Sequence, residues 1–141
     1  MPIPLPQGFQ AEGISCQMKD DPTKLDLGLI VSDRPAVAAG VYTRNLICAA
    51  PVVLDRARTP SDRMRAIVIN SGIANACTGA QGLVDARQMA RAVAAAVRVE
   101  EDQVLVLSTG VIGALLPMAK IESGIVKAAA GLGRRSDDLL V

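Results

Sequence analysis

Two clusters of small and hydroxyl-bearing residues are the parts of this sequence best suited to chemistry. One is Asn70–Gly79, with the sequence N-S-G-I-A-N-A-C-T-G, and the other is Ser108–Gly113, with the sequence S-T-G-V-I-G. Each follows a short apolar run, 66–69 or 104–107. A buried strand that delivers such a loop exposes backbone N–H groups and hydroxyls. These groups suit the capture of a developing oxyanion or of a small polar ligand.

The second cluster offers two hydrogen-bond donors at adjacent positions. The hydroxyl of Thr109 and the N–H of Gly110 could point at one oxygen, since glycine lets the backbone approach a ligand closely. That is the geometry of an oxyanion hole, but a polar strand end followed by a glycine turn has the same sequence. Ser108 as a nucleophile is disfavoured because the G-x-S-x-G motif is absent.

The first cluster could cradle a phosphate, yet it lacks the lysine of a P-loop and the G-x-G-x-x-G pattern. The alternative is a tight strand-to-helix connection that uses small residues for close packing. We expect Cys77 in this segment to be a buried, unreactive side chain, because no cationic residue lies near it in the sequence.

The remaining charged residues predict no site. Lys19, Lys120 and Lys127 are interpreted as solvated charges, the last two on the outer side of a helix. The pair Asp20–Asp21 precedes a proline and predicts a turn rather than a cation site, because no third carboxylate is spaced to help.

Composition excludes several classes of protein. The 141 residues contain no histidine, which removes Ser-His-Asp and Cys-His nucleophile systems and the usual zinc sites. A net charge of +1 and an aromatic content of 1% argue against nucleic-acid binding. The three cysteines form no C-x-x-C pair, and the N-terminus lacks the pattern of a signal peptide. No apolar run is long enough for a membrane span. We therefore expect a cytoplasmic protein with free thiols and with no metal or bound cofactor.

The first half of the chain predicts strands. Alternating residues indicate a strand at 25–31, and a second strand at 36–43 would complete an antiparallel hairpin through a turn at 32–35. A short helix is expected at 45–50, ended by Pro51, with a further strand at 51–54.

The second half predicts buried strands alternating with amphipathic helices. Strands are expected at 66–69 and 104–107, and helices at 83–97 and from Pro117 to about residue 131. Ser136 resembles the N-cap of one more helix. The whole predicts one α/β (α+β) domain over residues 1–141.

Together the motifs resemble those of the α chain in the bifunctional glutamate N-acetyltransferase/ornithine acetyltransferase family of arginine biosynthesis. Their order and spacing are specific, and they run nearly from end to end. The segments that carry the resemblance are Gly8–Gly13, Asp26–Asp33, Ala38–Thr43, Ala49–Val52, Asn70–Gly79, Ser108–Gly113, Leu116–Met118 and Lys120.

The resemblance implies a layered αββα sandwich of the N-terminal-nucleophile type, formed with a separate β chain. In such a family the precursor cleaves itself and the new N-terminal threonine of the β chain is the nucleophile. It takes an acetyl group from N-acetylornithine and passes it to glutamate by a ping-pong mechanism, usually in an α2β2 heterotetramer. The family's oxyanion hole corresponds here to Thr109 and Gly110. Acetyl-CoA is a further potential co-substrate.

The missing histidine agrees with this expectation, because an N-terminal threonine carries its own base in the α-amine. None of the five threonines is N-terminal, so the nucleophile is expected on the partner chain. The family's α chain normally continues through a threonine-rich segment to the cleavage site, and this sequence does not contain that segment. A different hypothesis is a non-catalytic domain that binds a small ligand or serves as a scaffold.

Overall fold

The computed structural model describes residues 5–133, which form one mixed sheet and a layer of helices. The predicted helix at Ser136 lies outside the described residues. In chain order the elements are β1 (Phe9–Ile14), β2 (Leu27–Ala38), α1 (Ala50–Arg58), β3 (Ser61–Ile73), α2 (Gly79–Val97), a short 3-10 turn (Glu101–Gln103), β4 (Val104–Val111) and α3 (Met118–Gly131).

The four strands lie in the order β1-β2-β3-β4. β1 pairs with β2 and β2 pairs with β3, both antiparallel, whereas β3 and β4 run parallel. Parallel neighbours need a crossover, and α2 provides it. The carboxyl ends of β3 and β4 therefore meet at one edge, which is where the two small-residue clusters lie.

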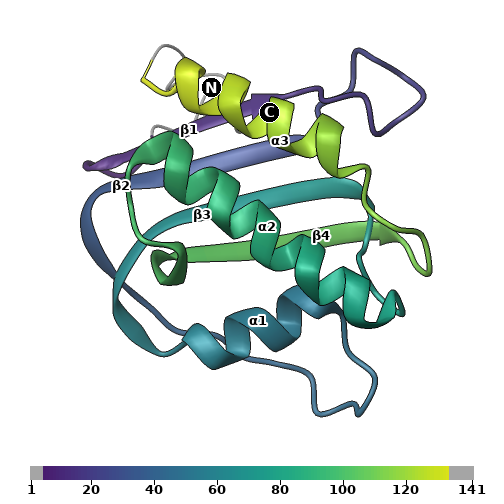
Figure 1. Cartoon of the computed structure of the whole chain (residues 1–141). Helices are drawn as coiled ribbons and strands as arrows, with labels where there is room; N and C mark the ends of the chain where they lie inside the picture. Colours follow the sequence, from purple (N-terminus) through teal and green to yellow (C-terminus); the bar gives the residue numbers. More distant parts are fainter. Residues whose placement is uncertain (1–4, 134–141) are drawn as a thin grey trace.

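Figure 1 shows α2 and α3 lying across one face of the sheet, while α1 lies beside β4. The apolar stripes predicted from the 3.6-residue period face the strands. Met89 and Val93 of α2 and Ile121 and Ile125 of α3 are fully buried, and they share a core with Val68 of β3. Both helices confirm the sequence prediction, although α2 begins four residues earlier than expected.

The predicted hairpin is wrong. Residues 27–38 form a single strand, and the expected turn at Ser32–Pro35 is an irregularity where the pairing with β3 shifts register. The strand stays extended because it has neighbours on both sides. Ser32 pairs with Phe9 of β1, and Asp33 N donates to Gly8 O (2.9 Å). The preference of a pre-proline residue for extended backbone fits a bulged strand as well as a turn.

The helix predicted at 45–50 and the strand predicted at 51–54 are also wrong. Pro51 lies in the first turn of α1 rather than after the end of a helix. Proline is tolerated there because the first N–H groups of a helix have no intrahelical acceptor. Strand β1 was not predicted at all.

The face of the sheet opposite α2 and α3 is apolar, and no described helix lies over it. Ile30, Ile67 and Leu105 occupy paired positions on it and are half-buried, and Leu107 is 44% exposed. A shallow apolar pocket of about 100 Å³ lies over this face and reaches Phe9. Among the described residues, no helix has the length and apolarity that crossing a membrane requires.

Candidate functional site

Thr109 and Gly110 lie near the end of β4, and both are exposed. Thr109 pairs with Ser71 of β3, and Gly110 pairs with Gly72. Side chains alternate along a strand, so the Thr109 side chain lies on the same face as Leu105 and Leu107. That face is the bare one.

Hydrogen bonds toward both ends of β4 indicate the direction of its N–H groups. Val106 N donates to the carboxylate of Asp55 on α1, on the side of β4 away from β3 (3.1 and 3.3 Å to the two oxygens). Val111 O instead accepts from Ala74 N, just beyond β3 (2.8 Å). Because these directions alternate from residue to residue, the N–H of Gly110 points the same way as that of Val106, toward the free edge of β4.

Position 110 accommodates only glycine. Its φ of +132° is a conformation that L side chains rarely adopt. A Cβ there would also lie 2.2 Å from the carbonyl carbon of Gly72 and 2.3 Å from its oxygen. The two paired glycines thus bring the ends of β3 and β4 together and hold the backbone around Thr109. The sequence marks Gly72 only as part of the Asn70–Gly79 cluster, and its pairing with Gly110 is a finding of the structure.

The structure separates Ser108 from its neighbour Thr109. Ser108 pairs with Asn70 on the helix-facing side, and its hydroxyl is buried with no hydrogen-bond partner among residues 5–133. A nucleophilic role for Ser108 therefore has no geometric support. The two clusters predicted as loops are in part strand ends, because β3 continues to Ile73 and β4 to Val111.

A pocket of about 350 Å³ adjoins Thr109 at the free edge of β4. Val41, Tyr42 and Val52 contribute apolar surface to it, and Asp55 contributes a carboxylate. Burial raises the pKa of Asp55 to about 6, although the N–H of Val106 and the charge of Arg58 favour the ionised form. Asp55 was missed in the sequence analysis, because nothing in its local pattern marks it.

The Asn70–Gly79 cluster is a strand-to-helix connection built around Asn75. This residue is fully buried with a φ of 48°. Its side-chain nitrogen donates to Gly82 O (2.8 Å), and its side-chain oxygen accepts from the Thr78 hydroxyl (2.7 Å). The predicted burial of Cys77 is wrong, because this residue is exposed. The backbone has a positive φ at Cys77 itself (57°) as well as at Asn75.

The acidic residues of the 15–26 loop have structural roles. Asp21 accepts from the N–H and the hydroxyl of Thr23, which confirms the predicted turn. Asp26 is buried and accepts N–H bonds from Cys16 (2.6 Å), Met18 (2.7 Å) and Lys19 (3.2 Å). Although burial opposes its ionisation, these bonds hold the pKa of Asp26 below its usual value.

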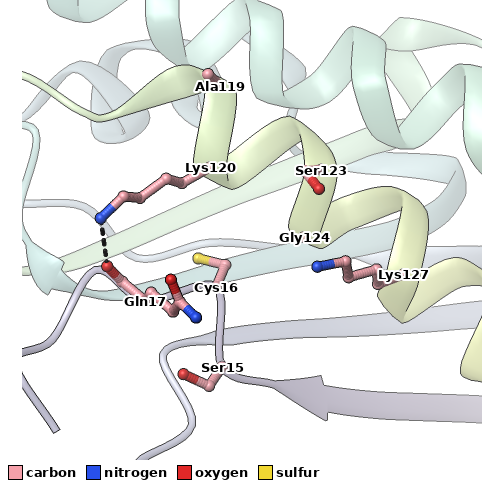
Figure 2. Close-up of a pocket in the computed structure, with 8 residues that line it drawn as sticks. All are labelled: Ser15, Cys16, Gln17, Ala119, Lys120, Ser123, Gly124 and Lys127. Carbon is pink, nitrogen blue, oxygen red and sulfur yellow. Dashed lines mark hydrogen bonds between the residues drawn. The ribbon is translucent and has the colours of Figure 1, made fainter. Parts of the chain in front are cut away.

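Lys120 and Lys127 are exposed, as predicted, but they lie on the flank of α3 that borders the 15–17 segment rather than on its outer side. Lys19 donates to Leu25 O (3.1 Å). A pocket of about 330 Å³ lies between α3 and the segment that follows β1. Figure 2 shows Lys120 at this pocket, where it donates to Gln17 O (2.8 Å). Burial is the largest factor that raises the pKa of the adjacent Cys16 thiol, to about 12, so the thiol is neutral. Within residues 5–133, no three acidic, cysteine or histidine side chains are grouped so as to hold a metal.

Comparison with known proteins shows which family model and which relatives this chain matches. The model of the ArgJ family matches residues 10–139. The chain is 50% identical over 132 residues to the arginine biosynthesis bifunctional protein ArgJ of Geobacter sulfurreducens, covering 94% of this chain and 33% of the relative. For the protein of the same name from Thermotoga neapolitana, identity is 47% over 133 residues, with 92% and 33% covered. The chain thus spans about a third of the length of these relatives.

Two solved structures resemble the fold closely. The arginine biosynthesis bifunctional protein ArgJ of Bacillus halodurans superposes with a TM-score of 0.81 at 42% identity, covering 87% of this chain and 65% of that one. An ornithine acetyltransferase of Mycobacterium tuberculosis, solved in complex with ornithine, gives a TM-score of 0.87 at 39% identity, covering 93% and 70%.

Proposed function

The chain belongs to the ArgJ family, and on that basis we propose that it is the α part of an acetyltransferase that moves an acetyl group from N-acetylornithine to glutamate. The observation that carries the proposal is the position of Thr109 and Gly110. A hydroxyl on the bare face of the sheet and an N–H at the free edge of β4 are adjacent and accessible. Two such donors can bind one oxygen that develops negative charge.

The proposed reaction has two half-reactions. The hydroxyl of an N-terminal threonine on a partner chain attacks the acetyl carbonyl of N-acetylornithine, and its own α-amine takes the proton. Collapse of the tetrahedral intermediate breaks the amide bond and releases ornithine, which leaves an acetyl-threonine ester. The amine of glutamate then attacks the ester carbonyl, and N-acetylglutamate leaves. Both tetrahedral intermediates carry an oxyanion that the hydroxyl of Thr109 and the N–H of Gly110 would stabilise.

The partner chain would pack on the bare face of the sheet. A second sheet placed against Ile30, Ile67 and Leu105 would bury this apolar surface and build the αββα sandwich. The chain's coverage of only a third of its relatives is compatible with a separate β chain. We propose an α2β2 assembly in which acetyl-CoA is a potential second acetyl donor and no cofactor is bound permanently.

The decisive experiment replaces Thr109 by alanine in the full-length protein. We expect kcat for acetyl transfer to fall about 100-fold or more, because one donor to the oxyanion is lost. Thr109→Ser keeps the hydroxyl and should retain most of the activity. Thr23→Ala, in the exposed 21–24 turn, is the control for loss of a threonine hydroxyl. An unchanged rate for Thr109→Ala would remove the assigned role.

Intact-mass analysis separates this proposal from a binding or scaffolding domain. We expect a companion chain that begins with threonine to purify with the native protein. Adding N-acetylornithine or acetyl-CoA to this complex and measuring the mass of that chain would show which donor acetylates it. A single 14.6 kDa species without a companion would favour the non-catalytic alternative.

A further inference from the structure

The free edge of β4 is held by two residues of α1. Arg58 donates to Val104 O (2.5 Å), and Asp55 accepts from Val106 N. Both bonds satisfy backbone groups that point away from β3 and would otherwise form an unpaired sheet edge. Asp55 anchors β4 at Val106, the later of the two anchored positions, which precedes Thr109 by three residues and Gly110 by four.

Beyond Val106, most of β4 is exposed. Leu107, Thr109 and Gly110 are exposed, and the 350 Å³ pocket opens between this stretch and α1, with Asp55 and Thr109 both in its lining. The N–H groups of Val106 and Gly110 point to the same side of β4. The bond to Asp55 fixes the orientation of the peptide group at Val106, and the directions of the N–H groups that follow along the strand depend on that orientation. A tilt of the strand at Val106 would turn both Thr109 and Gly110.

We propose that Asp55 is a positioning residue for acetyl transfer, which acts through the Val106 N–H to hold Thr109 and Gly110 in the orientation that binds the oxyanion. The inference rests on the proposed function of these two residues. Donors that are already oriented contribute most to stabilising a transition state, so loss of this anchor should lower kcat more than it raises KM. The anchor requires an acceptor atom at position 55 rather than a negative charge.

The test is a double-mutant cycle for acetyl transfer by the full-length protein. Asp55→Ala alone should lower kcat about tenfold while KM changes less than about twofold. Asp55→Asn keeps an acceptor oxygen and should restore kcat to within about threefold of the original protein. When Thr109 is already alanine, the factor by which Asp55→Ala lowers kcat should be at least about threefold smaller than in the original protein. The reason is that the effects of residues that act as a unit are not additive.

Asp85→Ala is the matched control. Asp85 is another buried carboxylate, but it lies on α2 and accepts from Gln81 (2.7 Å). Its removal should affect kcat equally with or without Thr109. If Asp55→Ala does not yield folded protein, the same cycle with Asp55→Glu replaces it, since the longer side chain displaces the acceptor.

The outcomes separate the two proposals. If Thr109→Ala leaves the rate unchanged, the proposed oxyanion hole is wrong and the inference falls with it. If Thr109→Ala slows the reaction but the Asp55 variant is additive with it, only the inference is overturned. Equal losses for Asp55→Asn and Asp55→Ala would also overturn it, because the acceptor alone would not be sufficient.

Discussion

At the scale of single residues, two glycines decide how closely β3 and β4 approach. Gly72 and Gly110 pair at the ends of parallel strands, and each has a φ near +130°. Strands with a side chain at position 110 could not bring their backbones together in the same way, because a Cβ there would overlap the backbone of Gly72. The geometry of the proposed donor pair thus depends on the lack of a side chain at Gly110 as well as on the Thr109 hydroxyl.

We predict that Gly110→Ala lowers the free energy of unfolding by about 3 kcal/mol, from strained φ and overlap combined. Gly113→Ala is the control, because φ there is +85° but no atom lies within 4 Å of a Cβ. Gly113→Ala should lower the free energy of unfolding by only about 1 kcal/mol. Denaturant unfolding of the full-length proteins measures both. Equal losses would show that the contact with Gly72 is unimportant.

The raised pKa of Asp55 should make the free energy of unfolding depend on pH. Its pKa rises from 3.8 in the unfolded chain to about 6, because burial disfavours the charge more than the Val106 N–H and Arg58 favour it. The folded state therefore binds this proton more tightly. The resulting contribution to stability is present below about pH 4 and is lost as the pH rises through 6. The nearby Arg58 is itself paired with Glu101 (3.1 Å).

Asp55→Asn keeps the acceptor and removes this titration. At pH 4 the variant and the original protein should have similar free energies of unfolding. At pH 7 the variant should be the more stable, by up to about 3 kcal/mol for a shift of about two units. Unfolding curves at the two pH values test the prediction, and a difference that does not change with pH would contradict it.

At the scale of elements, α3 packs closely on the sheet because position 124 has no side chain. A Cβ at Gly124 would lie 2.8 Å from both the Cβ of Cys16 and the Cδ2 of Leu27. Figure 2 shows Gly124 on the side of α3 that faces Cys16. The helix can therefore approach the end of β1 and the start of β2.

We expect Gly124→Ala to destabilise the protein by about 2 kcal/mol despite the better helix propensity of alanine, because the core is overpacked. The neighbouring Ser123 is exposed, and Ser123→Ala should change stability by less than about 0.5 kcal/mol. Thermal unfolding compares the two. If Gly124→Ala raised the melting temperature, the helix would have room that the structure does not provide.

At the scale of the whole molecule, the sheet has two unequal faces. Helices α2 and α3 cover one face (Figure 1). The other face presents apolar side chains that are half-buried or exposed in this chain alone. Contiguous apolar surface on a folded chain indicates a contact with another protein surface. The proposed second sheet would meet this requirement along the whole length of β2, β3 and β4.

Ile67→Glu should therefore prevent assembly with the partner chain. Ile67 pairs with Ile30 and Leu105 at the centre of the bare face, so the proposed interface would bury an unpaired carboxylate. On size-exclusion chromatography we expect about tenfold less companion chain to elute with the variant. Val126→Glu is the control, since Val126 is 62% exposed on the outer side of α3. Similar retention in both variants would argue against the bare face as the interface.

The amino-acid sequence alone determined the features that depend on near neighbours in the chain. Helical periodicity located α2 and α3, the motifs identified the family, and the adjacency of Thr109 and Gly110 followed directly from their order. Only the tertiary structure decided that β2 is one strand, that α1 lies along the free edge of β4, and that the carboxylate of Asp55 accepts a hydrogen bond from the N–H of Val106. Local patterns record which face of a segment is buried. Strand neighbours, and the acceptor for an edge N–H, are set by segments up to 51 residues apart, whose meeting depends on how the whole chain packs.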